Sequence, residues 1–362
     1  MKTKRNETPK NAIPPGHMLH WYCIKSILGQ GGFGITYLAR DTNLDEDVAI
    51  KEYLPADLAV REGDCSVNPL SESHGEKFRD GMQRFIGEAR TLSRFRHQNI
   101  VRVRSVFEAN NTAYMVMDYE DGDSLQQVIA RDAPISEPRL RNILLPILSG
   151  LEHMHAVGYI HRDIKPANIF LRRDGSPILL DFGSARQAVG MQTRTLTTLV
   201  SPGYAPFEQY FTKGRAQGPW TDIYSLAATL YKAIAGRSPL NAVDRSECIL
   251  QSVPDIFVPI AEIGVGHYSR QFLAAIDHAL SFRAEHRPQN VTDWRREFTA
   301  TEPVAVKQVS DDEPTVAAEA LDAPKSGLYV PALRRVFQSV FHFTAIVTVL
   351  VGVGMLGHTI VA

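Results

Sequence analysis

The chain has 362 residues, of which 44% are hydrophobic and 22% charged, and its formal net charge is −1. This composition is that of a globular protein rather than a disordered one, and the length allows two or three domain-sized units. A charge so close to zero gives no basic field that would attract nucleic acid, and three widely separated cysteines exclude a disulfide framework.

The first part of the chain is rich in strand patterns. Residues 1–19 are polar, lack the apolar core of a secretory signal and are expected to form a flexible arm. From about residue 20 to residue 118, strand-like runs (HWYCIKSIL, ITYLAR, DVAIKEYL and AYMVMDY) accompany one helical run, FRDGMQRFIGEARTLSRF. This order predicts a small, strand-rich lobe that contains one helix.

The stretch LGQGGFGITYLA (28–39) contains a GxGxxG pattern between two of these strand-like runs. Glycine lets the backbone turn tightly and brings its amides close to phosphate oxygens. A Rossmann dinucleotide site requires a helix directly after this loop, whereas ITYLAR continues as a strand. The pattern therefore predicts a flap over a nucleotide. Its residues are Leu28, Gly29, Gln30, Gly31, Gly32, Phe33 and Gly34.

A lysine ends the next apolar strand run, VAIK (48–51). Because the stem of Lys51 is expected to be buried, its ammonium needs an anionic partner. Glu88 is the natural candidate, since it lies one helical turn before Leu92 near the inward face of the helical run. Taken singly, Glu88 is better interpreted as a surface salt-bridge residue, and only the joint pattern with Lys51 favours an inward pair.

From about residue 121 to residue 300 helical patterns dominate, which predicts an α+β protein with a ligand cleft between two lobes. The stretch YIHRDIKPANIFL places a carboxylate (Asp163), an ammonium (Lys165) and a carboxamide (Asn168) within six residues. Asp163 can accept the proton of an attacking hydroxyl, and Lys165 can neutralise a phosphoryl group. Asn168 can bind a divalent metal ion, as can Asp181 of LLDFGSAR. Phosphoryl transfer needs this combination of positioning and charge neutralisation.

The GxGxxG loop, VAIK, the helical glutamate, HRDxKxxN and DFG follow one another in this order within about 150 residues. Together they resemble the eukaryotic-type (Hanks-type) serine/threonine protein kinases of bacteria, over roughly residues 20–300. The resemblance implies a two-lobed kinase fold that uses ATP with Mg²⁺, or Mn²⁺, to phosphorylate Ser and Thr hydroxyls of protein substrates. The lysine two residues beyond the HRD aspartate resembles the Ser/Thr class rather than the Tyr class.

Roles are implied by the same resemblance. Lys51 would bind the α- and β-phosphates and pair with Glu88, Asp163 would be the catalytic base, and Lys165 would contact the transferred phosphate. Asn168 and Asp181 would be the metal ligands. The adenine pocket would comprise Thr36, Ala49, Met117, Asp118 and Glu120. Supporting roles would fall to Leu92, His161, Phe182, Ser201, Glu208, Asp222 and Arg287.

Two features depart from or add to this pattern. The connection YLPADLAVREGDCSVNPLSESHGEK after Lys51 is longer than the family usually has, which leaves the register of Glu88 open and predicts extra structure on the small lobe. Arg162 precedes the catalytic aspartate, where the family commonly binds a phosphate on the activation loop. The candidate autophosphorylation sites are Thr193, Thr195, Thr197 and Thr198, which could also be ordinary polar loop residues.

The end of the chain has a different character. Residues 301–335 are rich in Ala, Pro and acidic residues and predict a disordered linker. Residues 336–362 contain no Asp, Glu, Lys or Arg and predict one membrane-spanning helix, because a helix of this length exceeds the roughly 30 Å of a bilayer core. Arg334 and Arg335 precede it, which predicts a single-pass protein of the bacterial inner membrane with its kinase domain in the cytoplasm.

Two alternatives to an active protein kinase fit these motifs less well. A pseudokinase scaffold usually lacks the strand lysine, the HRD aspartate or the DFG aspartate, whereas this chain has all three. A small-molecule phosphotransferase of the same distant fold would lack the HRDxK spacing and the SPGYAPFE segment (201–208), and both are present here. Both alternatives are therefore disfavoured.

Overall fold

A computed structural model of the chain describes residues 11–181, 200–211, 217–251 and 253–299. They all belong to one compact unit, which extends from Met1 to Glu302. The predicted linker, the predicted membrane helix, Phe182 and the four candidate threonines lie outside the described residues. Within the described ranges, no helix is both long and apolar enough to cross a bilayer.

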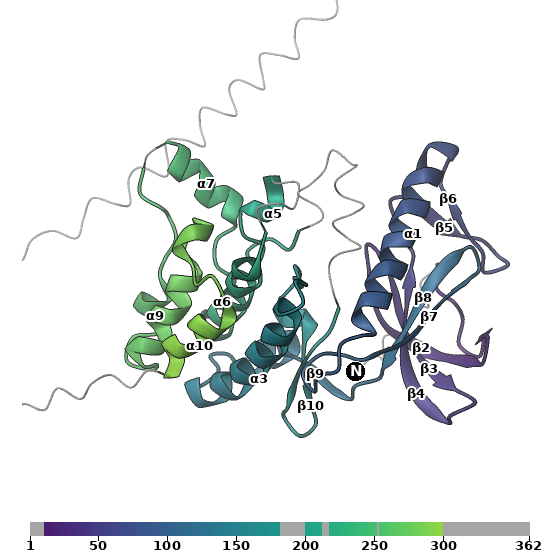
Figure 1. Cartoon of the computed structure of the whole chain (residues 1–362), viewed down its shortest axis with the longest axis horizontal. Coiled ribbons are helices and arrows are strands. Elements are labelled where there is room, and N and C mark those ends of the chain that lie inside the picture. Colours follow the sequence, from purple (N-terminus) through teal and green to yellow (C-terminus); the bar gives the residue numbers. More distant parts are fainter. Residues whose placement is uncertain (1–10, 182–199, 212–216, 252, 300–362) are drawn as a thin grey trace, which may run out of the picture. The chain divides into compact units, whose positions relative to one another are not determined.

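The small lobe is built on a six-stranded antiparallel sheet with the order β1-β2-β3-β4-β8-β7 (Figure 1). Its strands are β1 (Met18–Leu19), β2 (Tyr22–Gly31), β3 (Gly34–Asp41), β4 (Glu46–Tyr53), β7 (Val103–Ala109) and β8 (Thr112–Asp118). Buried and half-buried residues alternate along β3, as expected for a strand with one face on a core. The predicted run HWYCIKSIL begins at a left-handed residue, His20 (φ 52°), which lies between β1 and β2.

One long helix, α1 (Glu72–Leu92), covers β7 and β8. Apolar residues recur at helical spacing along its buried face, and two of them, Phe78 and Phe85, pack their rings against Tyr53 of β4 at 5.3 and 5.7 Å between centroids. Burying such an aromatic side chain contributes roughly 2 kcal/mol. Aromatic packing therefore fixes the helix against the strand that carries Lys51.

The predicted extra structure between β4 and α1 is a short hairpin of β5 (Ala59–Arg61) and β6 (Val67–Pro69). The amide of Val67 donates to the carbonyl of Asn110 at 2.8 Å, so the hairpin lies beside the β7–β8 turn. Three residues of the hairpin are buried, namely Ala59, Arg61 and Val67. The long connection is thus an ordered addition to the small lobe.

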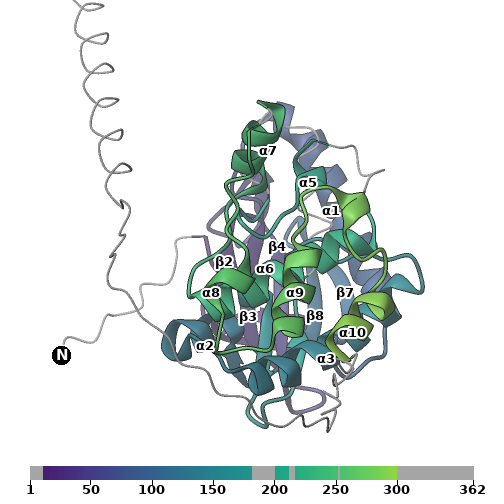
Figure 2. The same ribbon diagram turned by 90° about the vertical axis from the view of Figure 1, so that its left-hand side faces the viewer.

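The large lobe is mainly helical. Its small sheet has the order β11-β10-β9 and comprises β9 (Gly122–Ser124), β10 (Ile169–Arg172) and β11 (Pro177–Leu179). The helices are α2 (Leu125–Asp132), α3 (Glu137–His155), α5 (Glu208–Phe211), α6 (Pro219–Ala235), α7 (Ala242–Leu250), α8 (Ile260–Ile263), α9 (Arg270–Ala279) and α10 (Val291–Thr299). Figure 2 shows α8, α9 and α10 around α6, which contacts all three and is buried on almost every side. The predicted succession of a strand-rich lobe and a helix-rich lobe is confirmed.

Backbone hydrogen bonds connect the two lobes near the site residues. The amide of Val101 donates to the carbonyl of Leu179 at 3.0 Å, and the amide of Leu179 donates to the carbonyl of Asn99 at 2.9 Å. Leu179 ends β11, two residues before Asp181. The segment that carries Asp181 is therefore anchored to the connection between α1 and β7.

Candidate functional site

The glycine-rich loop is the tip of a hairpin in which β2 ends at Gly31 and β3 begins at Gly34. A Cβ atom on Gly34 would lie 1.9 Å from the carbonyl oxygen of Glu52, so only glycine fits between β3 and β4 at this point. The residues from Leu28 to Gly32 are exposed. All seven predicted flap residues therefore lie on one hairpin, directly beside the strand that carries Lys51.

Lys51 and Asp181 meet although 130 residues separate them. Nζ of Lys51 donates to Oδ1 of Asp181 at 2.9 Å, and their side chains are 23% and 43% exposed. Asp181 has a left-handed backbone (φ 43°), a conformation that aspartate tolerates better than most residues. Glu88 lies buried on α1, as its predicted inward register requires. Its ion pair with Lys51 stays a prediction.

Asp163 is the centre of a hydrogen-bonded cluster and is 7% exposed. Nζ of Lys165 donates to its two carboxylate oxygens at 3.2 and 3.0 Å, and Oγ of Ser201 donates to Oδ1 at 2.9 Å. Lys165 also donates to Ser201 at 3.1 Å. Charge-assisted bonds of this kind fix the direction of the carboxylate, whose oxygens can accept a proton.

Asn168 lies in a single 3₁₀ turn, Pro166–Asn168, and joins the two aspartates. Its amide nitrogen Nδ2 donates to Oδ2 of Asp163 at 2.9 Å and to the backbone carbonyl of Asp181 at 3.3 Å. Among the described residues no group of three or more His, Cys, Asp and Glu side chains is suited to hold a metal ion. Magnesium needs only one or two side-chain oxygens when phosphates supply the others, and the oxygen atoms of Asn168 and Asp181 fit that requirement.

A buried carboxylate, Asp222 of α6, orients the backbone before Asp163. It accepts hydrogen bonds from the amides of His161 and Arg162, both at 2.8 Å, and from Nε2 of His155 at 2.8 Å. Burial opposes its charge, yet these bonds outweigh burial and lower the pKa of Asp222 below its usual value. Arg162 adopts the left-handed region (φ 71°), so Asp222 stabilises a strained turn.

His161 is fully buried beside Asp163. Desolvation lowers its pKa, which keeps the ring neutral. The amide of Asp163 donates to Nδ1 at 3.2 Å, so Nε2 carries the proton and donates to the carbonyl of Leu180 at 3.1 Å. The ring thereby links the turn before Asp163 to the residue before Asp181.

Three further contacts brace this part of the large lobe. Arg287 and Glu208, which were both expected to be supporting residues, form a buried ion pair at 2.8 Å, and Thr221 donates to Glu208 at 3.1 Å. Gln209 donates to the backbone carbonyl of Arg162 at 2.8 Å. The sequence reasoning missed His155 and Gln209 as supporting residues. No motif marks either of them, and their roles depend on contacts across 67 and 47 residues.

The predicted adenine-pocket residues lie on neighbouring strands. Ala49 of β4 pairs with Met117 of β8, and both are buried, whereas Thr36 of β3 is half-buried and pairs with Lys51. Asp118 accepts from Arg104, and Glu120 accepts two hydrogen bonds from Arg172 at 2.6 and 3.0 Å. These two carboxylates are engaged in ion pairs and therefore serve the connection between the lobes.

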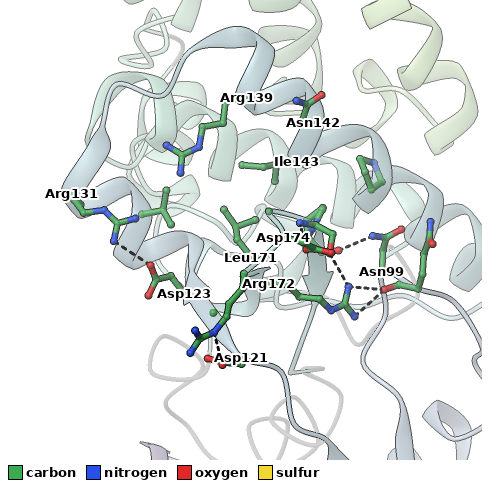
Figure 3. Close-up of a pocket in the computed structure, with 18 residues that line it drawn as sticks. Asn99, Asp121, Asp123, Arg131, Arg139, Asn142, Ile143, Leu171, Arg172 and Asp174 are labelled. Carbon is green, nitrogen blue, oxygen red and sulfur yellow. Dashed lines mark hydrogen bonds and ion pairs between the residues drawn. The ribbon is translucent and has the colours of Figure 1, made fainter.

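A separate groove of about 1280 Å³ lies on the large lobe next to this connection (Figure 3). The eighteen residues that line it do not include Lys51, Asp163 or Asp181. Its guanidinium groups are paired with carboxylates, as in Arg131 with Asp123 at 3.1 Å. The groove is thus distinct from the cluster that carries the reactive groups.

Comparison with known proteins agrees with this geometry. Residues 22–289 match the family model described as the protein kinase domain. Over 273 residues the chain is 32% identical to the serine/threonine-protein kinase PknK of Mycobacterium tuberculosis, covering 75% of this chain and 23% of PknK. Over 313 residues it is 30% identical to the serine/threonine-protein kinase PknB of the same organism, covering 83% of this chain and 46% of PknB. The chain thus spans less than half of these relatives.

Solved structures give the same result for the fold. The apo form of PpkA-294 matches with a TM-score of 0.72 and 38% identity, over 79% of this chain and 99% of that chain. The kinase domain of PknI from Mycobacterium tuberculosis matches with a TM-score of 0.57 and 21% identity, over 80% and 99% respectively. The predicted resemblance is confirmed, and the chain belongs to the protein kinase domain family, among the Hanks-type serine/threonine kinases of bacteria.

Proposed function

We propose that this chain transfers the γ-phosphate of ATP to Ser and Thr hydroxyls of proteins, with Mg²⁺ as the cofactor. The observation that carries the proposal is the cluster around Asp163, in which Lys165, Ser201 and Asn168 all contact one carboxylate. The Lys51–Asp181 pair brings a cation from the small lobe to the same region. The groups that phosphoryl transfer requires are therefore gathered in one place.

Each group has a distinct task in this reaction. Asp163 would accept the proton of the attacking hydroxyl, and Lys165 beside it would neutralise the phosphoryl group in transit. Lys51 would bind the α- and β-phosphates, while Asn168 and Asp181 would hold Mg²⁺, which neutralises charge on the phosphates when it is bound. Asp222 positions the backbone that carries Asp163 and does not itself react.

Radiolabelled ATP and a protein substrate would test this function in a comparison of wild type with Asp181→Asn. Loss of the carboxylate removes a metal ligand, so we expect transfer to fall by about a hundredfold or more. Asp174→Asn is the matched control, because Asp174 is exposed and lies in the separate groove. Equal labelling by wild type and Asp181→Asn would contradict the proposal. Nucleotide binding without labelling would favour a pseudokinase, and labelling only of small molecules would favour the other phosphotransferase class.

Regulation by autophosphorylation belongs to the same proposal. Arg162 is half-buried, and its Nε atom has no hydrogen-bond partner among the described residues. A buried guanidinium donor without an acceptor is costly and favours an anion nearby. A phosphate on Thr193, Thr195, Thr197 or Thr198 would supply that anion and give the kinase a link to bacterial signalling.

Anchoring in the bacterial inner membrane is proposed from the uncharged sequence of residues 336–362 alone. We expect the full chain to stay in the membrane pellet after an alkaline carbonate wash, with the kinase domain accessible from the cytoplasmic side. A chain that ends near Ser326 lacks this segment and should be released. Recovery of the full chain in the wash would contradict insertion into the lipid bilayer.

A further inference from the structure

A buried carboxylate, Glu52, lies next to Lys51 on β4 but on the other face of the sheet. Successive strand residues point to opposite faces, and Tyr53, which faces α1, lies on the same face as Lys51. Glu52 is fully buried and accepts hydrogen bonds from Tyr37 of β3 at 2.9 Å and from Tyr114 of β8 at 2.7 Å. The proposed function does not use Glu52.

The charge of Glu52 is compensated by Arg61, the last residue of β5. Nη2 of Arg61 donates to Oε2 of Glu52, and the Arg61 side chain is only 3% exposed. The same guanidinium donates to the carbonyl of Cys65 at 2.6 Å and to that of Asn11 at 2.8 Å. The β5–β6 hairpin and the start of the described chain are therefore tied to the centre of the sheet through one ion pair.

Between Glu52 and Arg61, the chain contacts the glycine-rich turn. The amide of Leu54 donates to the carbonyl of Phe33, and the amide of Ala56 donates to the carbonyl of Gly32, both at 3.0 Å. Gly32 and Phe33 are the two residues between β2 and β3. We call residues 54–58 the arch. Its first end is fixed by β4, and its second end is fixed by Arg61.

We propose that the Glu52–Arg61 ion pair positions the glycine-rich turn, because it holds the arch next to that turn. Glu52 and Arg61 are then positioning residues for the nucleotide phosphates. This inference rests on the proposed function and on the predicted role of the turn as a flap over the nucleotide. A turn already held in one orientation loses less conformational freedom when a nucleotide binds, which strengthens binding. Without the ion pair, the second end of the arch would be held only by the remaining contacts of the β5–β6 hairpin, and the turn would sample more conformations.

The test is the double variant Glu52→Gln/Arg61→Met in the full-length chain. It removes both charges, so that no carboxylate is left buried without its partner, and glutamine can still bond to the two tyrosines. We expect the Kd for Mg²⁺–ADP and the KM for ATP to rise about tenfold, with kcat within about threefold of wild type. Hydrogen exchange at the amides of Leu54 and Ala56 should become at least about tenfold faster.

Controls separate positioning from general destabilisation. Arg245→Met removes an equally buried arginine from an ion pair with Asp255 in the large lobe, and it should leave the Kd unchanged. Arg61→Lys keeps the charge but offers fewer donors, so it should give an intermediate Kd, and it replaces the double variant if that does not fold. A Kd within twofold of wild type in a folded variant, or unchanged exchange at Ala56, would overturn the inference.

The binding readout keeps this inference distinct from the proposed activity. If wild type binds Mg²⁺–ADP but labels no protein, the kinase activity fails and the Kd comparison still decides the role of the ion pair. If wild type binds no nucleotide, the proposed function fails, and nucleotide positioning fails with it. Unchanged exchange at the arch with normal kinase activity would overturn the positioning role alone.

Discussion

Asp163→Asn is expected to lower kcat by about 10²- to 10⁴-fold, the contribution typical of a general base. The change keeps the shape of the side chain but removes the carboxylate that accepts from Lys165, Ser201 and Asn168. The Kd for Mg²⁺–ADP should stay within about threefold of wild type, because Asp163 is assigned to the acceptor hydroxyl and not to the nucleotide. Steady-state phosphorylation of a protein substrate and equilibrium binding of Mg²⁺–ADP measure the two effects.

Ser201→Ala is the control for this first prediction. Ser201 shares Asp163 with Lys165, whose ammonium still contacts the carboxylate at 3.0 Å when the hydroxyl is removed. We therefore expect kcat to fall by less than about tenfold, as for loss of one positioning hydrogen bond. An Asp163→Asn enzyme that retains a tenth or more of the wild-type kcat would refute the assignment of Asp163 as the base.

Asp222→Asn is expected to destabilise the protein by about 3–5 kcal/mol, as for removing one partner from a buried charged network. Asparagine has a single side-chain acceptor oxygen, and its NH₂ group would face one of the backbone amides that now donate to Asp222. For a domain of this size, the thermal midpoint should fall by roughly 10 °C. Thermal unfolding of wild type and variant at neutral pH measures the change.

The pH dependence of the stability difference between wild type and Asp222→Asn tests whether that difference is electrostatic. The pKa of Asp222 is lowered in the folded protein, so its stabilisation is present above the unfolded value of 3.8 and is lost as the pH falls through the folded pKa. The midpoint difference between wild type and Asp222→Asn should therefore stay constant from about pH 7 to 5 and shrink below about pH 4. Asp174→Asn, at an exposed site, should leave the neutral-pH midpoint unchanged. A difference that already disappears between pH 7 and pH 5 would assign the effect to another group.

The local parts of the site follow directly from short spacings in the sequence. Asp163, Lys165 and Asn168 lie within six residues, and in the structure they contact one another through the turn that they form. The need for glycine at position 34 was likewise visible as part of GxGxxG, although its cause, the carbonyl of Glu52, is a contact with a neighbouring strand. Strand and helix periodicity also predicted the order of the two lobes, because a buried face imposes its period on the chain.

Contacts between distant segments were decided by the tertiary structure alone. The sequence named both Lys51 and Asp181, but it did not indicate that folding places the Lys51 ammonium 2.9 Å from the Asp181 carboxylate. It flagged the connection after Lys51 as extra structure, yet no spacing indicated that Arg61 would reach Glu52 on the far face of β4. Sequence patterns report which residues face inward, because that depends on local geometry. Which inward-facing groups meet depends on how segments up to 130 residues apart pack, and only the folded chain determines that.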